Sequence, residues 1–332
     1  MPRDLALDLG TANTLVYAEP EGIVIREPTL CAVKGDSGEV VAFGEAAYAA
    51  AQADELLLIR PLRHGSITDF DVTERMMRFL LEDHRGGWLS QPRVLVAASG
   101  AATSVERRAV TEAILAAGAR QVLLVDETIA AAIGAGLPID EPAGTCIVDI
   151  GGGTTEVAII SLGGVVSSQA TTVGGIDFDD AILRLLRDEH DLAATERTAE
   201  RIKREVASAV PLNDEPDLEI RGRDLRTGAP KEVLVSAKQV RLALDDQIGR
   251  ILEVIRECFS VTPPDLAQDV LDRGITLTGG GSLLRGLDTR VAQETHLPVH
   301  LAEDPLSTVA IGAGRALASL DRLRDLGLVT VA

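Results

Sequence analysis

A glycine-rich stretch near the middle of the chain constrains its fold more than any other. An apolar run at 146–148 ends in Asp149, three glycines and two threonines follow at 151–155, and a second apolar run begins at Val157. This pattern predicts a β-hairpin with a tight polar tip. Glycines let the backbone approach a ligand closely, and the N–H groups of such a turn form a concave anion site. The stretch therefore indicates a phosphate site, and a hairpin tip without a ligand is the alternative.

The same pattern occurs a second time near the N-terminus. Apolar residues lead into Asp8, Gly10 follows, and the polar pair Asn13 and Thr14 takes the place of the two threonines. The two copies are separated by close to half of the 332 residues, which indicates two related halves rather than the short repeats of a solenoid. Because ligand sites form preferentially between domains, the sequence predicts a nucleotide clamped between two phosphate-binding hairpins.

The composition is that of an acidic globular protein with room for two hydrophobic cores. Hydrophobic residues make up 46% of the chain but aromatic residues only 2%, so the cores must consist of aliphatic side chains. The formal net charge of −19 argues against nucleic acid as a partner, because general binding of that kind requires a basic surface. The same charge opposes contact with anionic lipid, so membrane contact would require an apolar insertion.

The cysteines and the N-terminus favour a cytoplasmic protein. Cys31, Cys146 and Cys258 are odd in number and lack the spacing of a metal site, which indicates reduced, partly buried thiols. The first ten residues do not form a signal peptide, and no apolar run approaches the ~20 residues that span a bilayer.

Three further segments bear on function. Two helices rich in Ala and Gly, at 129–136 and 307–317, end the two halves. We expect them to cross closely at a hinge, with ordinary Ala-rich helices as the alternative. A strand at 274–278 leads into a third glycine-rich turn and a helix at 283–287, which predicts helix N-terminal N–H groups facing a nucleotide. Charges in the helix at 195–208 recur at i, i+3 and i+4, as on a solvated, salt-bridged face.

Two details of the first half give local expectations. The helix at 104–117 has Ser104 as its expected N-cap residue. The only tryptophan, Trp88, lies with Leu89 in a loop at 85–92 that contains two glycines and a proline. Trp88 either folds back onto the core or forms an exposed apolar tip that inserts into lipid or a partner.

These motifs, in this order and spacing, are similar to those of the superfamily that contains actin, sugar kinases and DnaK-type chaperones. Within it the chain resembles the MreB/Mbl family of bacterial actins, from residue 4 to about residue 317. The segments that carry the resemblance are 8–14, 105–108, 130–138, 148–157, 199–203, 277–282 and 302–306.

The resemblance implies an α/β, actin-like ATPase fold. Two related ribonuclease-H-like domains, each with a smaller subdomain, would enclose a nucleotide cleft. The implied bounds are 1–33, 65–145 and 311–332 for subdomain IA, 34–64 for IB, 146–180 and 245–310 for IIA, and 181–244 for IIB.

The resemblance also implies roles for individual residues. The cofactor would be ATP or ADP with Mg²⁺, which keeps its waters and takes one or two carboxylates, and Asp8 and Asp149 match its ligands. Glu127 matches the acid that positions the attacking water, with Thr154 assisting, as suits phosphoryl transfer. The other matches contact the phosphates (Thr11, Ala12, Asn13, Gly151, Gly152, Gly153, Thr154), the ribose and base (Glu200, Arg201, Ile202, Lys203) and the adenosine pocket (Gly279, Gly280, Gly281, Ser282).

Two departures from the family pattern bear on turnover. Thr128 replaces a proline after Glu127, which we expect to loosen the turn that aims this acid. Ile176 replaces an acidic residue after Gly174 and Gly175, which removes a polar group near the nucleotide. We therefore expect ATP binding with slow hydrolysis.

The implied function is that of an ATP-binding bacterial actin. Subunits would polymerise into paired protofilaments on the inner face of the cell membrane, where Trp88 and Leu89 match the family's membrane-inserting loop. The filament would recruit envelope-synthesis membrane proteins and organise cell shape or cell-wall synthesis. A sugar kinase or a chaperone-type ATPase of the same superfamily is the alternative, but the chain shows neither an insertion that recognises a sugar nor a substrate-binding domain before Ala332.

Overall fold

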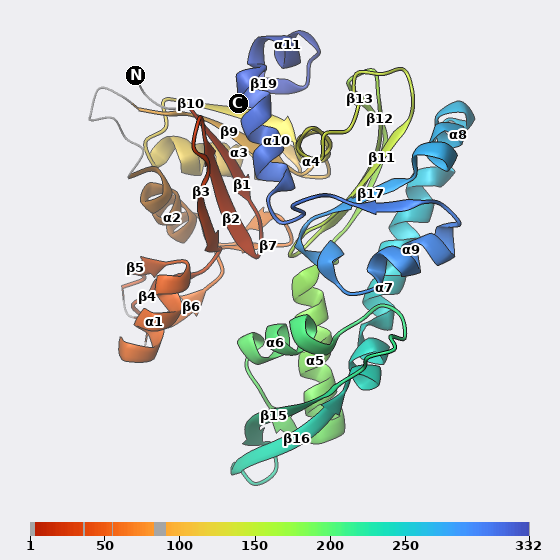
Figure 1. The fold of residues 1–332 in the computed structure, drawn as a ribbon. Helices are drawn as coiled ribbons and strands as arrows, with labels where there is room; N and C mark the ends of the chain where they lie inside the picture. The colour runs from red at the N-terminus through yellow and green to blue at the C-terminus, as the bar shows by residue number, and fades with distance from the viewer. Residues whose placement is uncertain (1–3, 36, 55, 83–90, 332) are drawn as a thin grey trace.

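The computed structural model describes residues 4–35, 37–54, 56–82 and 91–331. The first half of the chain and the C-terminal strand β19 form a six-stranded sheet with strand order β19-β10-β9-β1-β2-β3 (Figure 1). β1 pairs antiparallel with β2 and parallel with β9, which confirms the first predicted hairpin. The strands are β1 (Leu5–Leu9), β2 (Asn13–Ala18), β3 (Gly22–Pro28), β9 (Arg93–Ala98), β10 (Gln121–Asp126) and β19 (Val329–Val331).

Helices cover both faces of this sheet. Because side chains alternate along a strand, Leu5 and Leu7 of β1 face one helical layer and Ala6 faces the other. The first layer consists of α2 (Phe70–Glu82) and α3 (Ser104–Ala116). The second consists of α4 (Glu127–Gly134), α10 (Thr308–Ala318) and α11 (Leu320–Asp325).

The second half repeats this plan around a five-stranded sheet with order β13-β12-β11-β17-β18. β11 and β12 form the second predicted hairpin. Ile147 of β11 packs in the same cluster as α4 and α10, so these helices lie between the two sheets. The elements are β11 (Thr145–Ile150), β12 (Thr155–Ser161), β13 (Gly164–Thr171), β17 (Ile275–Thr278), β18 (Val299–Leu301), α5 (Gly175–His190), α7 (Ala237–Ser260), α8 (Pro264–Arg273) and α9 (Leu287–Thr295).

Each half carries a small subdomain at the lower end of the molecule in Figure 1. The subdomain of the first half contains β4 (Cys31–Val33), β5 (Val40–Phe43), β6 (Leu57–Ile59) and α1 (Glu45–Asp54). The subdomain of the second half contains β14 (Leu192–Ala193), β15 (Asp217–Asp224), β16 (Pro230–Ser236) and α6 (Glu196–Val206). A short hairpin of β7 (Leu62–Arg63) and β8 (Ser66–Ile67) leads from the first subdomain back to its sheet.

Helices α4 and α10 cross in direct backbone contact, as their small residues predict. A Cβ atom added to Gly134 would lie 1.9 Å from the carbonyl oxygen of Thr308, and one added to Gly312 would lie 1.7 Å from that of Ala130. Any side chain at either position would therefore force the helices apart. The close crossing is confirmed, and its action as a hinge stays a prediction.

Two local predictions are wrong. The N-cap of α3 is Thr103, whose hydroxyl accepts from the N–H of Glu106 in a capping box, so Ser104 is the first helical residue. The third glycine-rich turn leads into a short 3₁₀ helix (Gly280–Leu283), and the α-helix begins only at Leu287. The expected α-helical N-terminus at 283 is therefore absent from this part of the described chain.

Other expectations from composition agree with the described residues. The cores are aliphatic, and Phe178 is the aromatic among the largest fully buried side chains. Cys31, Cys146 and Cys258 are free thiols, and they are fully buried where partial burial was expected. None of the described helices has both the length and the apolar character needed to cross a bilayer.

Candidate functional site

A large cleft of about 1060 Å³ separates the two halves. Its volume is near the upper end of the roughly 300–1,000 Å³ of typical ligand sites. Residues of both sheets, of α6 and of the third glycine-rich turn line it. The predicted site residues that line it are Asp8, Thr11, Ala12, Asn13, Glu127, Asp149, Gly151, Gly152, Thr154, Glu200, Arg201, Lys203, Gly279, Gly280 and Gly281.

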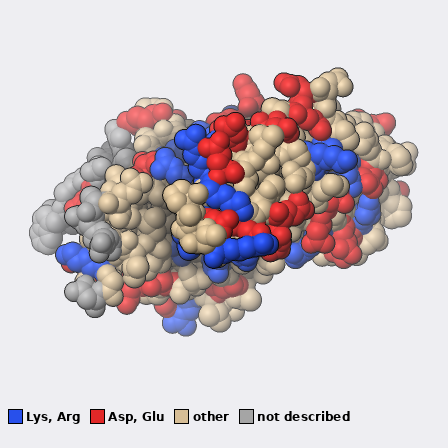
Figure 2. Space-filling model, turned by 90° about the horizontal axis from the view of Figure 1, so that it is seen from below, with Lys and Arg blue, Asp and Glu red and all other residues tan. Residues whose placement is uncertain are grey.

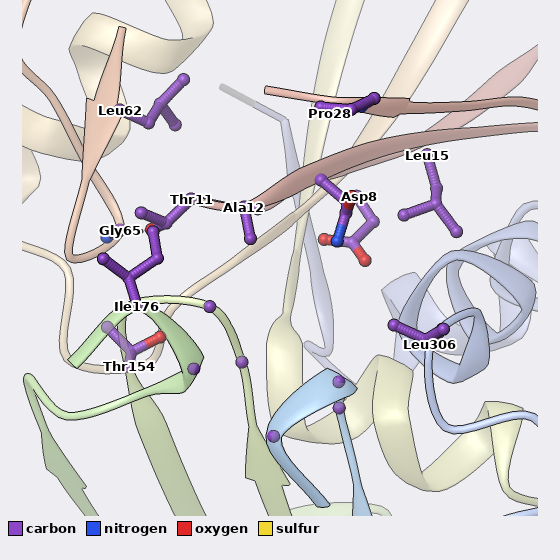
Figure 3. A pocket seen from close by; sticks show the side chains of 18 of the residues that line it. Asp8, Thr11, Ala12, Leu15, Pro28, Leu62, Gly65, Thr154, Ile176 and Leu306 are labelled. Carbon is purple, nitrogen blue, oxygen red and sulfur yellow. Dashed lines mark hydrogen bonds between the residues drawn. The ribbon is translucent and has the colours of Figure 1, made fainter. Parts of the chain in front are cut away.

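The tips of the two hairpins meet across this cleft. A Cβ atom added to Gly152 would lie 2.5 Å from the Cβ of Ala12 and 2.8 Å from its backbone N. One added to Gly153 would lie 2.9 Å from the hydroxyl oxygen of Thr11. Figure 3 shows the side chains of Thr11 and Ala12 near Thr154 of the opposite tip. Only glycine permits this approach at positions 152 and 153, which explains why the second copy has glycines where the first copy has Thr11 and Ala12.

The first residues of α5 form backbone hydrogen bonds with the tip of the second hairpin. The N–H of Gly175 donates to the carbonyl of Gly151 at 2.9 Å, and that of Ile176 donates to the carbonyl of Gly152 at 2.8 Å. A Cβ atom added to Gly174 would lie 2.7 Å from the carbonyl oxygen of Gly151. The pair Gly174 and Gly175 therefore sets the position of the second tip, and Ile176 lies beside Thr154 at its edge (Figure 3).

A turn between β7 and β8 holds both tips, which the sequence did not predict. The ring Nδ1 of His64 lies 3.0 Å from the carbonyl oxygen of Gly153, and the N–H of Gly65 donates to the hydroxyl of Thr11 at 3.0 Å. His64 has a φ of 46°, in the left-handed region that non-glycine residues rarely adopt. A His-Gly pair ahead of a short polar strand is the only signal in the sequence for this contact.

Two carboxyl groups stand at matching positions of the two hairpins. Burial raises the pKa of Asp8 to about 7. Burial, followed by repulsion from Asp8 and Glu156, raises the pKa of Asp149 to about 8. Among the described residues no group of three or more His, Cys, Asp and Glu side chains is arranged to hold a metal ion. The buried carboxyl of Asp149 and the partly buried carboxyl of Asp8, which repel each other, nevertheless fit a hydrated Mg²⁺, which takes one or two carboxylates and completes its shell with water and phosphate.

Glu127 begins α4 at the back of the cleft. Burial first, and then the charge of Glu156, raises its pKa well above the ordinary value. Asp126 caps the helix: its carboxylate accepts from the N–H of Thr128 at 2.9 Å and from the Thr128 hydroxyl at 2.6 Å. The expected loosening of this turn by Thr128 is therefore wrong, because the threonine hydroxyl adds a bond that proline cannot make.

Helix α6 presents only one of its faces to the cleft. The ammonium of Lys203 donates to the carbonyl of Gly175 at 2.9 Å and pairs with the carboxylate of Asp179 at 2.7 Å. Glu200 and Arg201 also line the cleft, whereas Ile202 is fully buried in the core of the second half. Asp179, which sequence reasoning missed, contributes a lining carboxyl whose pKa burial raises to about 6, although Lys203 opposes this rise.

The third glycine-rich turn closes the cleft beside Asp149. Gly279 has a φ of 80°, and a Cβ atom there would lie 2.3 Å from the Oδ1 atom of Asp149. The hydroxyl of Ser282 is buried and donates to the carbonyl of Gly279 at 2.6 Å. Ser282 and Gly153 therefore shape the turns from behind and do not line the cleft. The predicted membrane residues Trp88 and Leu89 lie outside the described residues.

Comparison with known proteins agrees with this geometry. The family described as MreB/Mbl protein matches residues 2–325. The chain belongs to the MreB/Mbl family. The cell shape-determining protein MreB of Escherichia coli (strain K12) is 44% identical over 326 residues, covering 96% of this chain and 94% of that protein. The cell shape-determining protein Mbl of Bacillus subtilis (strain 168) is 42% identical over 324 residues, covering 97% of each.

Solved structures share the whole fold. MreB5 of Spiroplasma citri bound to AMPPNP superposes with a TM-score of 0.91 at 34% identity over 99% of both chains. A MamK double helical filament has a TM-score of 0.82 at 22% identity, over 96% of this chain and 98% of that one, and this likeness shows the fold alone. The predicted actin-like fold is confirmed. The prediction of a bacterial actin of this family is also confirmed over the alternative of a sugar kinase or chaperone-type ATPase.

Proposed function

We propose that this chain binds ATP in the cleft and polymerises as a bacterial actin. The observation that carries the proposal is the contact between the tips of the two hairpins, one from each half. A triphosphate between them would meet backbone N–H groups from both sides. The relative MreB5 of Spiroplasma citri has been solved with AMPPNP and with ADP, which supports nucleotide binding by the same cleft.

The residues that line the cleft would contact different parts of the nucleotide. Thr11 to Asn13 and Gly151 to Thr154 would surround the phosphates, and Asp8 and Asp149 would hold Mg²⁺ through its waters. Mg²⁺ would supply neutralising charge at the phosphates. Glu200, Arg201 and Lys203 would contact the ribose and base. The turn at 279–281 would cover the adenosine.

Glu127 and Thr154 would position the water that attacks the terminal phosphate. The hydrogen bonds between Asp126 and Thr128 fix the first turn of α4. The orientation of the Glu127 carboxyl group would therefore not depend on a proline at position 128. Ile176 still places an apolar side chain where the family has an acid. We infer a slow ATPase whose turnover accompanies polymerisation.

The filament would act at the inner face of the cell membrane. Each subunit would have the four subdomains with the bounds given above. Subunits would stack head to tail into protofilaments, two protofilaments would pair, and the filament would bind lipid through Trp88 and Leu89. One small apolar tip is a weak anchor, so affinity would depend on many tips along a filament. The names of the relatives, cell shape-determining proteins, support a role in cell shape or cell-wall synthesis together with envelope-synthesis membrane proteins.

Co-pelleting with anionic liposomes tests the membrane part. The variant Trp88→Ala/Leu89→Ser should form filaments with ATP that stay in the supernatant when lipid is spun down slowly. Leu225→Ser, which removes an exposed leucine of the second small subdomain, is the matched control and should pellet with lipid like the wild type. Equal pelleting of all three proteins would contradict lipid contact through Trp88 and Leu89.

A further inference from the structure

Two contacts join the small subdomains directly across the mouth of the cleft. The guanidinium of Arg60 lies 3.3 Å from the carboxylate of Glu196, through both its Nε and a terminal nitrogen. The guanidinium carbon of Arg197 lies 5.4 Å from the ring centroid of Tyr48, within the range of a cation–π interaction. Arg60 and Tyr48 come from the first half of the chain, and Glu196 and Arg197 begin α6 in the second.

These contacts lie away from the point where the two halves are joined. The backbone contact of α4 and α10 lies between the two large sheets, whereas α1 and α6 lie toward the lower end in Figure 1. Seen from below, acidic and basic side chains alternate across the molecule (Figure 2). An opening motion about the α4–α10 crossing would separate the two small subdomains, so it would have to break both contacts.

The contacts also cover part of the nucleotide site. A small cavity beneath them is lined by Tyr48, Arg60, Ile176, Asp179 and Glu200, among others. All five of these residues also line the main cleft, and Tyr48 reaches it from α1. A nucleotide held between the glycine-rich tips therefore lies behind this bridge of side chains.

We propose that Arg60–Glu196 and Tyr48–Arg197 form a latch whose opening limits the release of nucleotide from the cleft. The inference rests on the proposed nucleotide binding and adds its kinetic control. Glu196 is 67% exposed and Arg60 22%, so each contact shifts the closed–open equilibrium by only about two- to fivefold. The latch therefore slows the release of nucleotide without preventing it. A protein that polymerises with ATP must still be able to replace bound ADP by ATP.

The exposed position of the latch makes it sensitive to salt. Interactions between exposed charges are largely screened at separations beyond about 8 Å at physiological ionic strength and beyond about 3 Å at 1 M, so the Arg60–Glu196 pair at 3.3 Å is weakened only at high salt. Release should accelerate with added salt in the wild type. A variant that lacks both contacts should show a much smaller acceleration.

The test measures release of a fluorescent ADP analogue by chase with excess ATP, in the full-length protein below its polymerisation concentration. Glu196→Gln and Tyr48→Leu should each raise the release rate about two- to fivefold, and the double variant about tenfold. The charge exchange Arg60→Glu/Glu196→Arg should return the rate toward that of the wild type. The control is Glu232→Gln, which breaks the exposed Arg221–Glu232 pair of the same subdomain at 2.7 Å and should leave the rate unchanged.

The outcomes separate the latch from the proposed function. Tight binding of the analogue with release rates equal to the wild type in all variants would overturn the latch and leave nucleotide binding in place. An acceleration of the same size in Glu232→Gln would also overturn it, because the effect would then follow general surface charge. Absence of binding in the wild type would contradict the proposed function itself.

Discussion

Replacing Gly312 with alanine tests the crossing of α4 and α10 that connects the two halves. The added Cβ would lie 1.7 Å from the carbonyl oxygen of Ala130 and 2.8 Å from the backbone N of Gly134. Since ordinary contacts begin at 3.4 Å, the helices would have to separate by roughly 1.7 Å. Overpacking a dense core costs about 1–3 kcal/mol, and backbone atoms cannot rotate away. We therefore expect Gly312→Ala to lower the free energy of unfolding by about 3 kcal/mol.

Gly249 supplies the matched control for the same substitution. It lies inside α7, and apart from the adjacent helix backbone no atom of the described residues lies within 4 Å of the position that its Cβ would take. Because alanine loses less backbone entropy than glycine in a helix, Gly249→Ala should stabilise the protein by about 0.5–1 kcal/mol. One chemical change is thus predicted to have opposite signs at two helical positions.

Urea unfolding followed by circular dichroism measures both effects. The midpoint of Gly312→Ala should move down and that of Gly249→Ala up, with the slopes unchanged. Since α4 carries Glu127 at its first turn, Gly312→Ala should also reduce phosphate release more than nucleotide affinity. A Gly312→Ala protein as stable as the wild type would refute the reasoning, and so would equal destabilisation by both substitutions.

Three further substitutions test the cleft. Gly152→Val drives side-chain atoms into Ala12 and should weaken ATP binding by roughly tenfold or more in a fluorescence titration; unchanged affinity would contradict contact between the tips. Glu127→Gln should lower phosphate release about 100-fold while ATP affinity stays within about twofold; equal losses in both would argue against a water-positioning role. Asp179→Asn removes a carboxyl whose pKa burial raises from 3.8 to about 6. The folded state binds that proton more tightly, so the stability it contributes is complete below about pH 4 and is lost as pH rises through 6, by about 3 kcal/mol. In urea unfolding the variant should therefore gain stability relative to the wild type between pH 4 and pH 7, and parallel pH profiles would rule this out.

The hairpins and the helix crossing were predictable because each depends on local sequence. A strand that ends in Asp and Gly and then resumes after polar residues has few alternatives to a hairpin, and the repeat reveals that there are two. Gly134 and Gly312 lie in Ala- and Gly-rich helices, whose composition already indicates close packing. The contact between Gly152 and Ala12 could not be predicted from any pattern in the sequence.

Errors arose where neighbouring residues offered equivalent chemistry. Thr103 and Ser104 are both good N-cap residues, and the choice depends on where Glu106 can reach back to the cap. The turn after Gly279 becomes 3₁₀ because Ser282 bonds back to it, which a glycine count does not show. Ile202 shares its motif with Lys203 but lies on the opposite, buried face of α6.

Long-range contacts were beyond the reach of the sequence. His64 lies 89 positions from the carbonyl that it contacts, and Arg60 lies 136 positions from Glu196. Neither residue belongs to a glycine-rich motif or a periodic pattern. Both are brought to the cleft by the path of the chain out of the small subdomain, which only the assembled fold determines.

The most direct test of the account is nucleotide-dependent assembly on lipid. Purified protein on anionic liposomes is imaged by negative-stain electron microscopy with ATP, with ADP and without nucleotide, and phosphate release is measured in parallel. The account predicts paired filaments on the lipid with ATP and slow release of phosphate. Tight ATP binding without filaments in any condition would contradict the claim that this chain polymerises by itself.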